Sequence, residues 1–356
     1  MKTGIIGLPQ VGKTSLFTIL TKSAPGAAAG RDAHLGVAKV PDDRLTKLAA
    51  VYKPKKLTYA TIDYVDVAAI GAEALKQTAY QATLRNVDAL ALVIRAFENP
   101  AVPSIDPINP LRDIQAVDLD LMINDLASIE KRLERLERDA KRGKDPEMQK
   151  EFDLLKKAQA QLESEKPLRE MEISAEDKKR IRGFMFLSEK PMLIVLNVGE
   201  EEVGELDKVV EKYQLQSLVT KRNVGVTAIC GKIEAELAEM SDADAAEFLS
   251  GYGLKESGLI RLINKTYELM GLISFLTIGE DECRAWTIPR SSKAVEAAGS
   301  IHSDLAKQFI RAETIHWDEL LELGSEAAAR AKGKLRLEGK DYIVQDGDVL
   351  HIRHGG

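Results

Sequence analysis

The strongest chemical signal in the sequence is an eight-residue segment near its N-terminus. Residues 7–14 read Gly-Leu-Pro-Gln-Val-Gly-Lys-Thr and match the pattern G-x-x-x-x-G-K-[ST], which binds phosphates where it follows a strand and opens a helix. Residues 3–6 form a short apolar run that is typical of a buried strand, and residues 14–20 have the pattern of a helix start. The alternative is a chance glycine-rich turn. Because position and flanking elements all agree, we predict a loop that wraps a chain of phosphates.

Each residue type in this segment has a physical reason to be there. Gly7 and Gly12 permit backbone torsions that turn successive N–H groups toward one point, and the helix N-terminus adds partial positive charge. Lys13 can carry its charge to the β and γ phosphates, and Thr14 offers a hydroxyl to Mg²⁺. The predicted phosphate-binding residues are Gly7, Leu8, Pro9, Gln10, Val11, Gly12, Lys13, Thr14 and Ser15.

A second group on the metal side is expected at the end of a later strand. Asp66 closes the segment Ile-Asp-Tyr-Val-Asp and is placed to hold Mg²⁺ or its water, and Asp63 is the competing carboxylate. A strand-end aspartate that caps a turn is the simpler alternative. We predict Lys13, Thr14 and Asp66 as the catalytic residues, with Thr14 and Asp66 as metal ligands and Mg²⁺ as the cofactor.

Selection of the base is expected in the loop after the strand at 192–196, which reads Asn197-Val-Gly-Glu200. GTP-specific switches usually present Asn-Lys-x-Asp here, where the aspartate accepts from guanine. This chain has glutamate in that place and no lysine, and Asn197 can pair with the edge of adenine. An acid-rich surface turn is the alternative. ATP is therefore favoured over GTP.

The elements that must position these residues indicate an α/β fold. Strands are expected at 35–40, 59–67, 89–94 and 192–196, and the last two are nearly all apolar. Such strands are buried on both faces, which is typical of a mostly parallel sheet with helices on each side. Residues 71–85 have a helical pattern. No internal repeat or low-complexity tract is evident.

Two further regions differ in pattern from this sheet domain. Residues 118–190 are densely charged, with apolar positions at spacings of three and four, a break at 143–146 and a stop at Pro167, which predicts an antiparallel helical hairpin. The C-terminal part predicts a small mixed domain with one helix near 300–309. Its short strands are expected at 275–278, 283–288, 312–316, 334–336, 342–344 and 349–353.

Composition limits the classes of function. The chain has 356 residues, a formal net charge of −6 and 44% hydrophobic residues, so two to three globular domains are expected. An acidic chain excludes nucleic-acid binding through overall charge but not through a local basic patch. Two cysteines cannot form a disulfide framework, and no apolar run reaches the roughly 18 residues of a membrane span. Candidate basic patches are Lys131, Arg132, Arg135 and Arg138 on the hairpin, and Lys293, Lys307 and Arg311 in the C-terminal domain.

Several long motifs resemble the Obg-like ATPase family of YchF type, within the TRAFAC class of P-loop NTPases. They are the segment at 7–17, Val-Pro-Asp-Asp-Arg-Leu-Thr-Lys-Leu at 40–48, Asn-Val-Gly-Glu at 197–200, Lys-Ile-Glu-Ala-Glu-Leu-Ala-Glu at 232–239, Arg-Ala-Trp-Thr-Ile at 284–288, and the stretch at 333–349. The resemblance covers essentially the whole chain. It implies a P-loop G domain at 1–117 and 191–272, interrupted by a helical coiled-coil hairpin at 118–190. A β-grasp-like TGS domain follows at 273–356.

The resemblance also implies function. It implies ATP binding and hydrolysis and association with the ribosome or ribosomal RNA, in a cytoplasmic protein that is expected to be a monomer and not bound to a membrane. By the same resemblance Val198 touches the base and Glu200 belongs to the base-selecting loop. Cys230 and Gly231 stand where the family has its Ser-Ala pair.

The switch regions depart from the family pattern. The Asp-x-x-Gly motif is replaced by Asp66-Val-Ala-Ala69, in which Ala69 can still donate its N–H to a γ-phosphate but cannot visit torsions reserved for glycine. Gly30 or Arg31 falls near the family's Mg²⁺-binding threonine, and Ser104 stands near its histidine. Ile70 follows Ala69, hydrophobic where many GTPases carry glutamine, as in the family. The family's redox-sensing cysteine is absent.

Three hypotheses follow. The first is a slow ATPase whose nucleotide state moves its domains, without an evident side-chain base for the attacking water. The second is a nucleotide-dependent binding module with little hydrolysis, suggested by the altered switches. The third is a GTP-binding translation factor, which would have to prefer guanine despite Glu200. A small-molecule kinase ranks below these because no second substrate pocket is recognisable.

Overall fold

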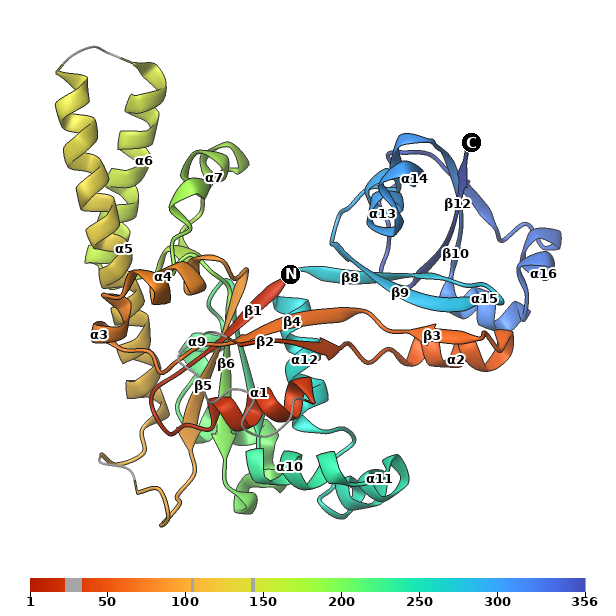
Figure 1. Ribbon diagram of the computed structural model, residues 1–356, viewed down its shortest axis with the longest axis horizontal. Helices are drawn as coiled ribbons and strands as arrows, with labels where there is room; N and C mark the ends of the chain where they lie inside the picture. Colours follow the sequence, from red (N-terminus) through yellow and green to blue (C-terminus); the bar gives the residue numbers. More distant parts are fainter. Residues whose placement is uncertain (23–33, 104–105, 142–144, 356) are drawn as a thin grey trace. The chain divides into compact units, whose positions relative to one another are not determined.

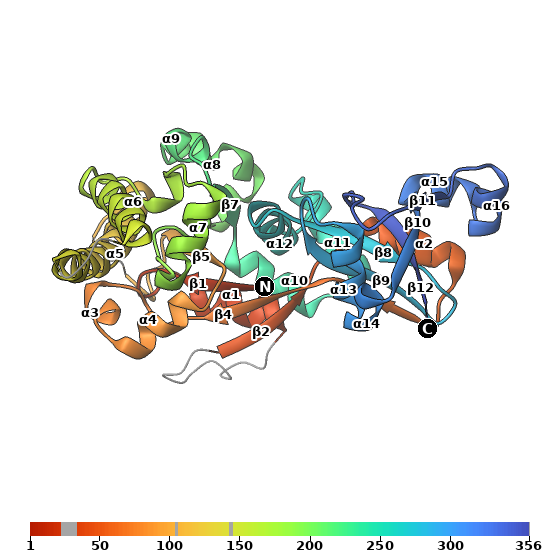
Figure 2. The ribbon, with the colours of Figure 1, turned by 90° about the horizontal axis from the view of Figure 1, so that it is seen from above.

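We analysed a computed structural model of the chain, which describes residues 1–22, 34–103, 106–141 and 145–355. The chain forms two compact units. The first contains residues 1–37 and 63–269, and the second contains residues 38–62 and 270–356. Figures 1 and 2 show the elements of each unit.

The first unit is built on a six-stranded sheet in the order β2-β4-β1-β5-β6-β7, and the pairs β4–β1, β1–β5, β5–β6 and β6–β7 are parallel. All residues of β5 and β6 are buried, so both faces of the sheet are covered, as the apolar runs predicted. The strands are β1 (Lys2–Ile6), β2 (His34–Lys39), β4 (Thr61–Asp66), β5 (Ala89–Ala96), β6 (Met192–Val198) and β7 (Val224–Ile229).

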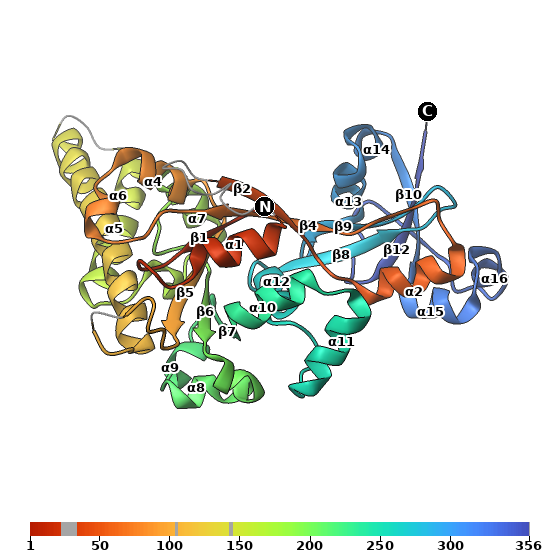
Figure 3. The same ribbon diagram turned by 60° about the horizontal axis from the view of Figure 1, so that its bottom comes forward.

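Helices pack on this sheet through regular apolar spacing. Ile114, Val117 and Leu121 of α5 (Pro110–Ala140) share one core cluster with Leu90 and Leu92 of β5. Helix α1 (Lys13–Thr21) packs on β1 and beside α10 (Gly231–Glu239), as Figure 3 shows. The remaining helices are α3 (Ala72–Leu75), α4 (Thr78–Arg85), α8 (Val209–Lys212), α9 (Gln216–Val219), α11 (Asp242–Gly251) and α12 (Gly258–Leu269), with a 3₁₀ segment η3 (Glu200–Lys208).

The predicted hairpin is formed by α5 and α6 (Pro146–Glu163), which lie side by side in Figure 1. Its seam contains Ile129, Leu133 and Leu136 of α5 with Leu155 of α6. Helix α5 begins at Pro110, earlier than the expected 118, because the Asn109 side chain caps it and proline suits a first helical turn. Residues 143 and 144 of the predicted break at 143–146 lie outside the described residues, and α6 begins at Pro146 after its N-cap Asp145. After α6 come η1 (Leu168–Glu170), α7 (Ala175–Ile181) and η2 (Arg182–Phe184).

The second unit contains a six-stranded mixed sheet in the order β11-β10-β12-β8-β9-β3. Its core includes Ile273, Phe275, Ile288, Phe309 and Leu350. The strands are β3 (Lys56–Thr58), β8 (Leu272–Thr277), β9 (Glu282–Pro289), β10 (Phe309–His316), β11 (Arg336–Glu338) and β12 (Asp348–His354). The helices are α2 (Asp43–Tyr52), α13 (Ala294–Ile301), α14 (Ser303–Lys307), α15 (Trp317–Leu323) and α16 (Glu326–Ala331).

Three local expectations in this unit differ from the structure. The single helix expected at 300–309 is instead α13 and α14, because the Glu296 carboxylate accepts from the Lys293 N–H and starts α13 early, and the extended residue His302 separates the two helices. Among the described residues the expected strand at 342–344 is reduced to one bridge between Ile343 and Lys293. The strand expected at 59–67 is shorter, with β4 at Thr61–Asp66, and a separate short strand, β3, precedes the expected run.

The expected boundary at residue 117 also places residues 38–62 with the first sheet, whereas the structure packs them with the C-terminal residues. Strand β3 pairs in parallel with β9, and Arg44 of α2 forms an ion pair with Asp346 at 2.8 Å. The ion pair joins residues 302 apart in sequence, and the strand pairing joins segments more than 200 residues apart, which local patterns do not reveal.

A buried carboxylate fastens the hairpin to the sheet. Asp125 of α5 accepts hydrogen bonds from the N–H groups of Leu187 and Ser188 and from the Ser188 hydroxyl, at 2.7–3.0 Å. Burial raises the pKa of Asp125 to about 6, against the opposing effect of these donors. Because the folded-state pKa is raised, this carboxyl favours folding most below its unfolded pKa, and the contribution is lost as the pH rises through about 6.

We therefore expect Asp125→Asn to lower the free energy of unfolding by about 1–3 kcal/mol, since its amide NH₂ faces donors. The difference in the free energy of unfolding between the wild type and this variant should be largest near pH 4 and decrease as the pH rises toward 7. Denaturant titrations across this range test it, with the exposed Asp139→Asn on the same helix as the matched control. A difference that grows with pH would contradict the assignment.

Candidate nucleotide-binding site

The loop between β1 and α1 has the strained backbone that the motif predicts. Gly7 and Gly12 have φ of 153° and 96°, and Gln10 between them is left-handed at 60°. A Cβ at Gly7 would overlap the carbonyl oxygen of Val93, so only glycine fits there. Alternating torsions of this kind form an anion nest, and Gly12 is also the N-cap of α1.

Lys13, Thr14 and Asp66 gather beside this loop, which places the three predicted catalytic residues together. The Lys13 ammonium donates to the Leu8 carbonyl at 2.6 Å, across the loop itself. Burial lowers the pKa of Lys13 to about 8, and the nearby charge of Asp66 opposes that shift. Burial also raises the pKa of Asp66, against a hydrogen bond with Thr14 and the charge of Lys13.

The competing carboxylate, Asp63, lies farther from the loop. In the register of β1 with β4, Asp66 stands opposite Ile5 near the carboxyl end of β1, whereas Asp63 stands opposite Lys2 at its start. Strand β4 ends at Asp66, so the geometry brings this residue to the same edge as the phosphate loop. Just beyond it the Ile70 N–H donates to the Gly7 carbonyl at 3.0 Å, which brings Ala69 next to the loop.

Asn197, at the end of β6, joins two loops of the site. Its amide nitrogen donates to the Val11 carbonyl and its oxygen accepts from the Gly231 N–H, both at 3.0 Å. Asn197 is predicted to pair with the edge of adenine. In the structure its amide orients the phosphate loop against the segment after β7, and one donor and one acceptor capacity remain for a ligand.

A cavity of about 590 Å³ opens beside Asn197 at this edge of the sheet. Its volume suits a nucleoside. Cys230 in its wall is buried, and burial raises the pKa of its thiol. Both cysteines are buried and free, as predicted. The predicted residues that line the cavity are Gly12, Ser15, Asn197, Val198, Glu200, Cys230 and Gly231.

Part of this cavity was not foreseen. Residues 97–100 form one wall, held by Arg95, which donates to the carbonyls of Phe97 and Val102 and stacks on the Phe97 ring at 4.7 Å. Lys232 is also in the wall and pairs with Glu200 at 2.5 Å. The available signal was that residues 97–100 follow a predicted buried strand, since the carboxyl ends of parallel strands meet at one edge.

Some predicted positions are not described. Gly30, Arg31 and Ser104 lie outside the described residues, so the structure neither supports nor opposes their expected roles. Within the described ranges no cluster of three His, Cys, Asp or Glu residues could hold a metal by itself. None of the helices described is long and apolar enough to cross a membrane.

Comparisons with known proteins agree with this geometry. The ribosome-binding ATPase YchF of Bacillus subtilis (strain 168) is 39% identical over 362 residues, covering 99% of each chain. The protein of the same name from Escherichia coli O157:H7 is 38% identical and is covered to 98% of its length. The chain belongs to the YchF family.

The C-terminal residues and the fold as a whole also match the YchF family. A family model named YchF-GTPase_C, described as a protein of unknown function (DUF933), matches residues 272–355. The structure of the YchF GTPase of Schizosaccharomyces pombe superposes with a TM-score of 0.83 at 29% identity, covering 99% of this chain and 97% of that one. The predicted family and the α/β P-loop fold are confirmed.

The Asn197 cross-link gives a test in this YchF family member. A Cβ at Gly12 would lie 2.6 Å from the Asn197 amide nitrogen, and the positive φ strains any other residue. We expect Gly12→Ala to weaken ATP binding at least tenfold in isothermal titration. Gly251→Ala, where nothing lies within 4 Å, is the matched control. Equal affinities for both variants would show that the cross-link does not shape the site.

Proposed function

We propose that this protein binds and hydrolyses ATP with Mg²⁺ and associates with the ribosome. The observation that carries the proposal is one continuous site: a strained glycine loop, a buried Lys13 and Asp66, and a nucleoside-sized cavity joined to the loop by Asn197. Its relatives in bacteria are named ribosome-binding ATPases. The predicted site residues that the structure describes all come from one chain, which supports action as a monomer, and association with ribosomes would place the protein in the cytoplasm.

The wall of the cavity favours adenine over guanine. Guanine recognition uses a carboxylate that accepts from two ring donors, and Glu200 is the residue available at that position. Its carboxylate is paired with Lys232 at 2.5 Å, so its charge is already partly neutralised. Asn197, with one remaining donor and one acceptor, matches an adenine edge. We therefore expect this site to prefer ATP over GTP.

The residues present fit a magnesium ion. One carboxylate oxygen of Asp66 is buried without a hydrogen-bond partner among the described residues, and the exposed Thr14 stands beside it. Magnesium takes few protein ligands and completes its shell with phosphates and waters, so Thr14 and Asp66 would hold it. When bound, the ion supplies charge neutralisation and orientation of the phosphates.

The protein's own contribution to hydrolysis is positioning and electrostatics. The loop amides and the α1 N-terminus orient the phosphates, and the buried Lys13 places a positive charge where negative charge develops. Ile70, where many GTPases carry a glutamine, is buried with 3% exposure. Because its side chain cannot orient a water, we expect slow turnover without a partner.

Phosphate release from the purified protein tests the proposal. We expect slow release from ATP, less from GTP, and loss of at least tenfold in Lys13→Ala. Lys22→Ala, a lysine just after the same helix, is the matched control. Turnover no better than that of Lys13→Ala would favour a binding module with little hydrolysis. Equal or faster release from GTP would refute the nucleotide assignment.

A further inference from the structure

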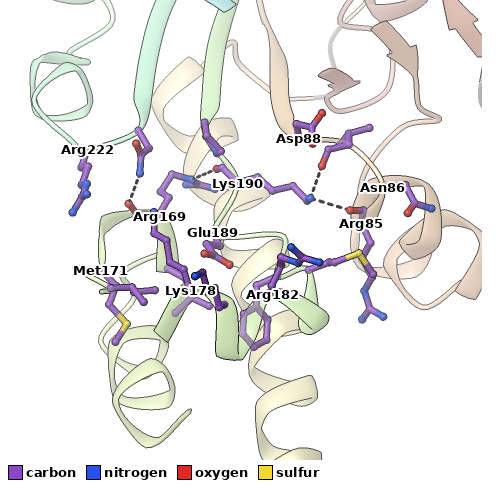
Figure 4. Close-up of a pocket in the computed structure, with 18 residues that line it drawn as sticks. Arg85, Asn86, Asp88, Arg169, Met171, Lys178, Arg182, Glu189, Lys190 and Arg222 are labelled. Carbon is purple, nitrogen blue, oxygen red and sulfur yellow. Dashed lines mark hydrogen bonds between the residues drawn. The ribbon is translucent and has the colours of Figure 1, made fainter. Parts of the chain in front are cut away.

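The first unit has a second cavity, of about 630 Å³, at the amino ends of its strands, opposite the nucleotide site (Figure 4). Its walls come from the end of α4, the residues that lead into β5, β6 and β7, and the segment from η1 to η2. Strand β6 joins the two sites, since Lys190 and Pro191 precede it and Asn197 lies near its end. Seven residues of strand span roughly 20 Å. The nucleotide site and this cavity therefore lie at opposite ends of the same strand.

The lining of this second cavity is strongly basic in a protein of net charge −6. Its two acidic residues are Asp88 and Glu189. Among the described residues Arg85, Lys179 and Arg182 form no ion pair, and Arg222 reaches only Glu172 at 4.0 Å. The seven basic residues are Arg85, Arg169, Lys178, Lys179, Arg182, Lys190 and Arg222.

Two cations, the buried Arg169 and the half-buried Lys190, fix the wall. The Arg169 guanidinium donates to Asp118 at 2.7 Å and to the Lys190 carbonyl at 3.0 Å, while its Nη2 is buried without a partner among the described residues. The Lys190 ammonium donates to the carbonyls of Arg85 and Val87, as drawn in Figure 4. The wall is thus preorganised, while the cations at 178, 179, 182 and 222 are exposed.

The floor is apolar. Apolar side chains between the cations are those of Val87, Leu168, Met171, Ile173, Met185, Phe186 and Pro191. A simple anion needs no apolar floor. A flat ring with phosphates attached uses both features, because its faces exchange water for apolar contact while its phosphates meet the cationic rim.

We infer that this basic cavity, which we call the Lys190 cavity, binds single-stranded RNA, with an unpaired base on the floor and adjoining phosphates on Lys178, Lys179, Arg182 and Arg222. An unpaired strand is required because the bases of a duplex are stacked inside it. The inference deepens the proposed ribosome association and rests on it, and it assigns the contact to the sheet edge away from ATP.

Fluorescence anisotropy with a labelled ten-nucleotide oligouridylate at 0.1 M salt tests this assignment. We expect the double variant Lys179→Glu/Arg182→Glu to bind at least tenfold more weakly. Its slope of log affinity against log salt should fall by about 1.4, at about 0.7 for each lost phosphate contact. Lys131→Glu/Arg135→Glu on the exposed side of α5 carries the same charge change and should bind like the wild type.

Other outcomes overturn the assignment. Equal weakening by the α5 variant would move the contact to the hairpin, and unchanged binding in the cavity variant would remove it from the cavity. If uridine monophosphate at the same nucleotide concentration displaces the labelled RNA, the ligand of the cavity is a free nucleotide. If polyglutamate displaces it, the ligand is an acidic protein. If the charge reversal unfolds the chain, Lys179→Gln/Arg182→Gln replaces it, with a smaller loss expected. Phosphate release from ATP should be unchanged in each variant, so failure here is distinct from failure of the ATPase proposal.

Discussion

The nucleotide site depends on one buried amide. Asn197 is 7% exposed, and its two hydrogen bonds hold the loop after β1 to the segment after β7. Residues from the beginning, middle and later part of the first unit therefore meet at one point. Each bond contributes about 1 kcal/mol net, but their larger effect is geometric: the glycine loop and the cavity wall keep one relative position. A phosphate chain and a base can be recognised together only if that position is fixed.

The sheet supplies the rigidity behind this amide. Every residue of β5 and β6 is buried, so neither strand can shift without opening the core on both faces. The polar residues of the two sites therefore lie at the ends of the strands. Asp66, Asn197 and Cys230 lie at the carboxyl edge, while Lys190 and Arg222 lie at the amino edge. The central strands are apolar spacers between two polar sites.

Features that depend on residues close together in the sequence could be predicted, whereas contacts between distant segments could not. The phosphate loop, Asp66 and the buried strands were predicted because each depends on neighbours within a few residues. The Glu200–Lys232 pair and the docking of Arg44 on Asp346 were not, since each joins segments that meet only in the fold. The wall at 97–100 is held locally by Arg95, but it reaches Asn197 and Gly231 only in the fold. The helix expected at 300–309 was wrong for a local reason, because the Glu296 carboxylate caps the Lys293 N–H and starts α13 earlier than the apolar spacing suggested.

The net charge of the chain and the charges that line one cavity can differ in sign. A net charge of −6 excludes binding of polyanions through the whole surface. Yet screening confines exposed charges to a range of about 8–10 Å, so a ligand in a cavity responds to the lining and not to the total. In the Lys190 cavity the buried Arg169 and the half-buried Lys190 donate to backbone carbonyls, while Lys179 and Arg182 are exposed and form no ion pair among the described residues. Because the net charge of the whole chain is negative, binding of a polyanion depends on such a local lining and not on the average surface.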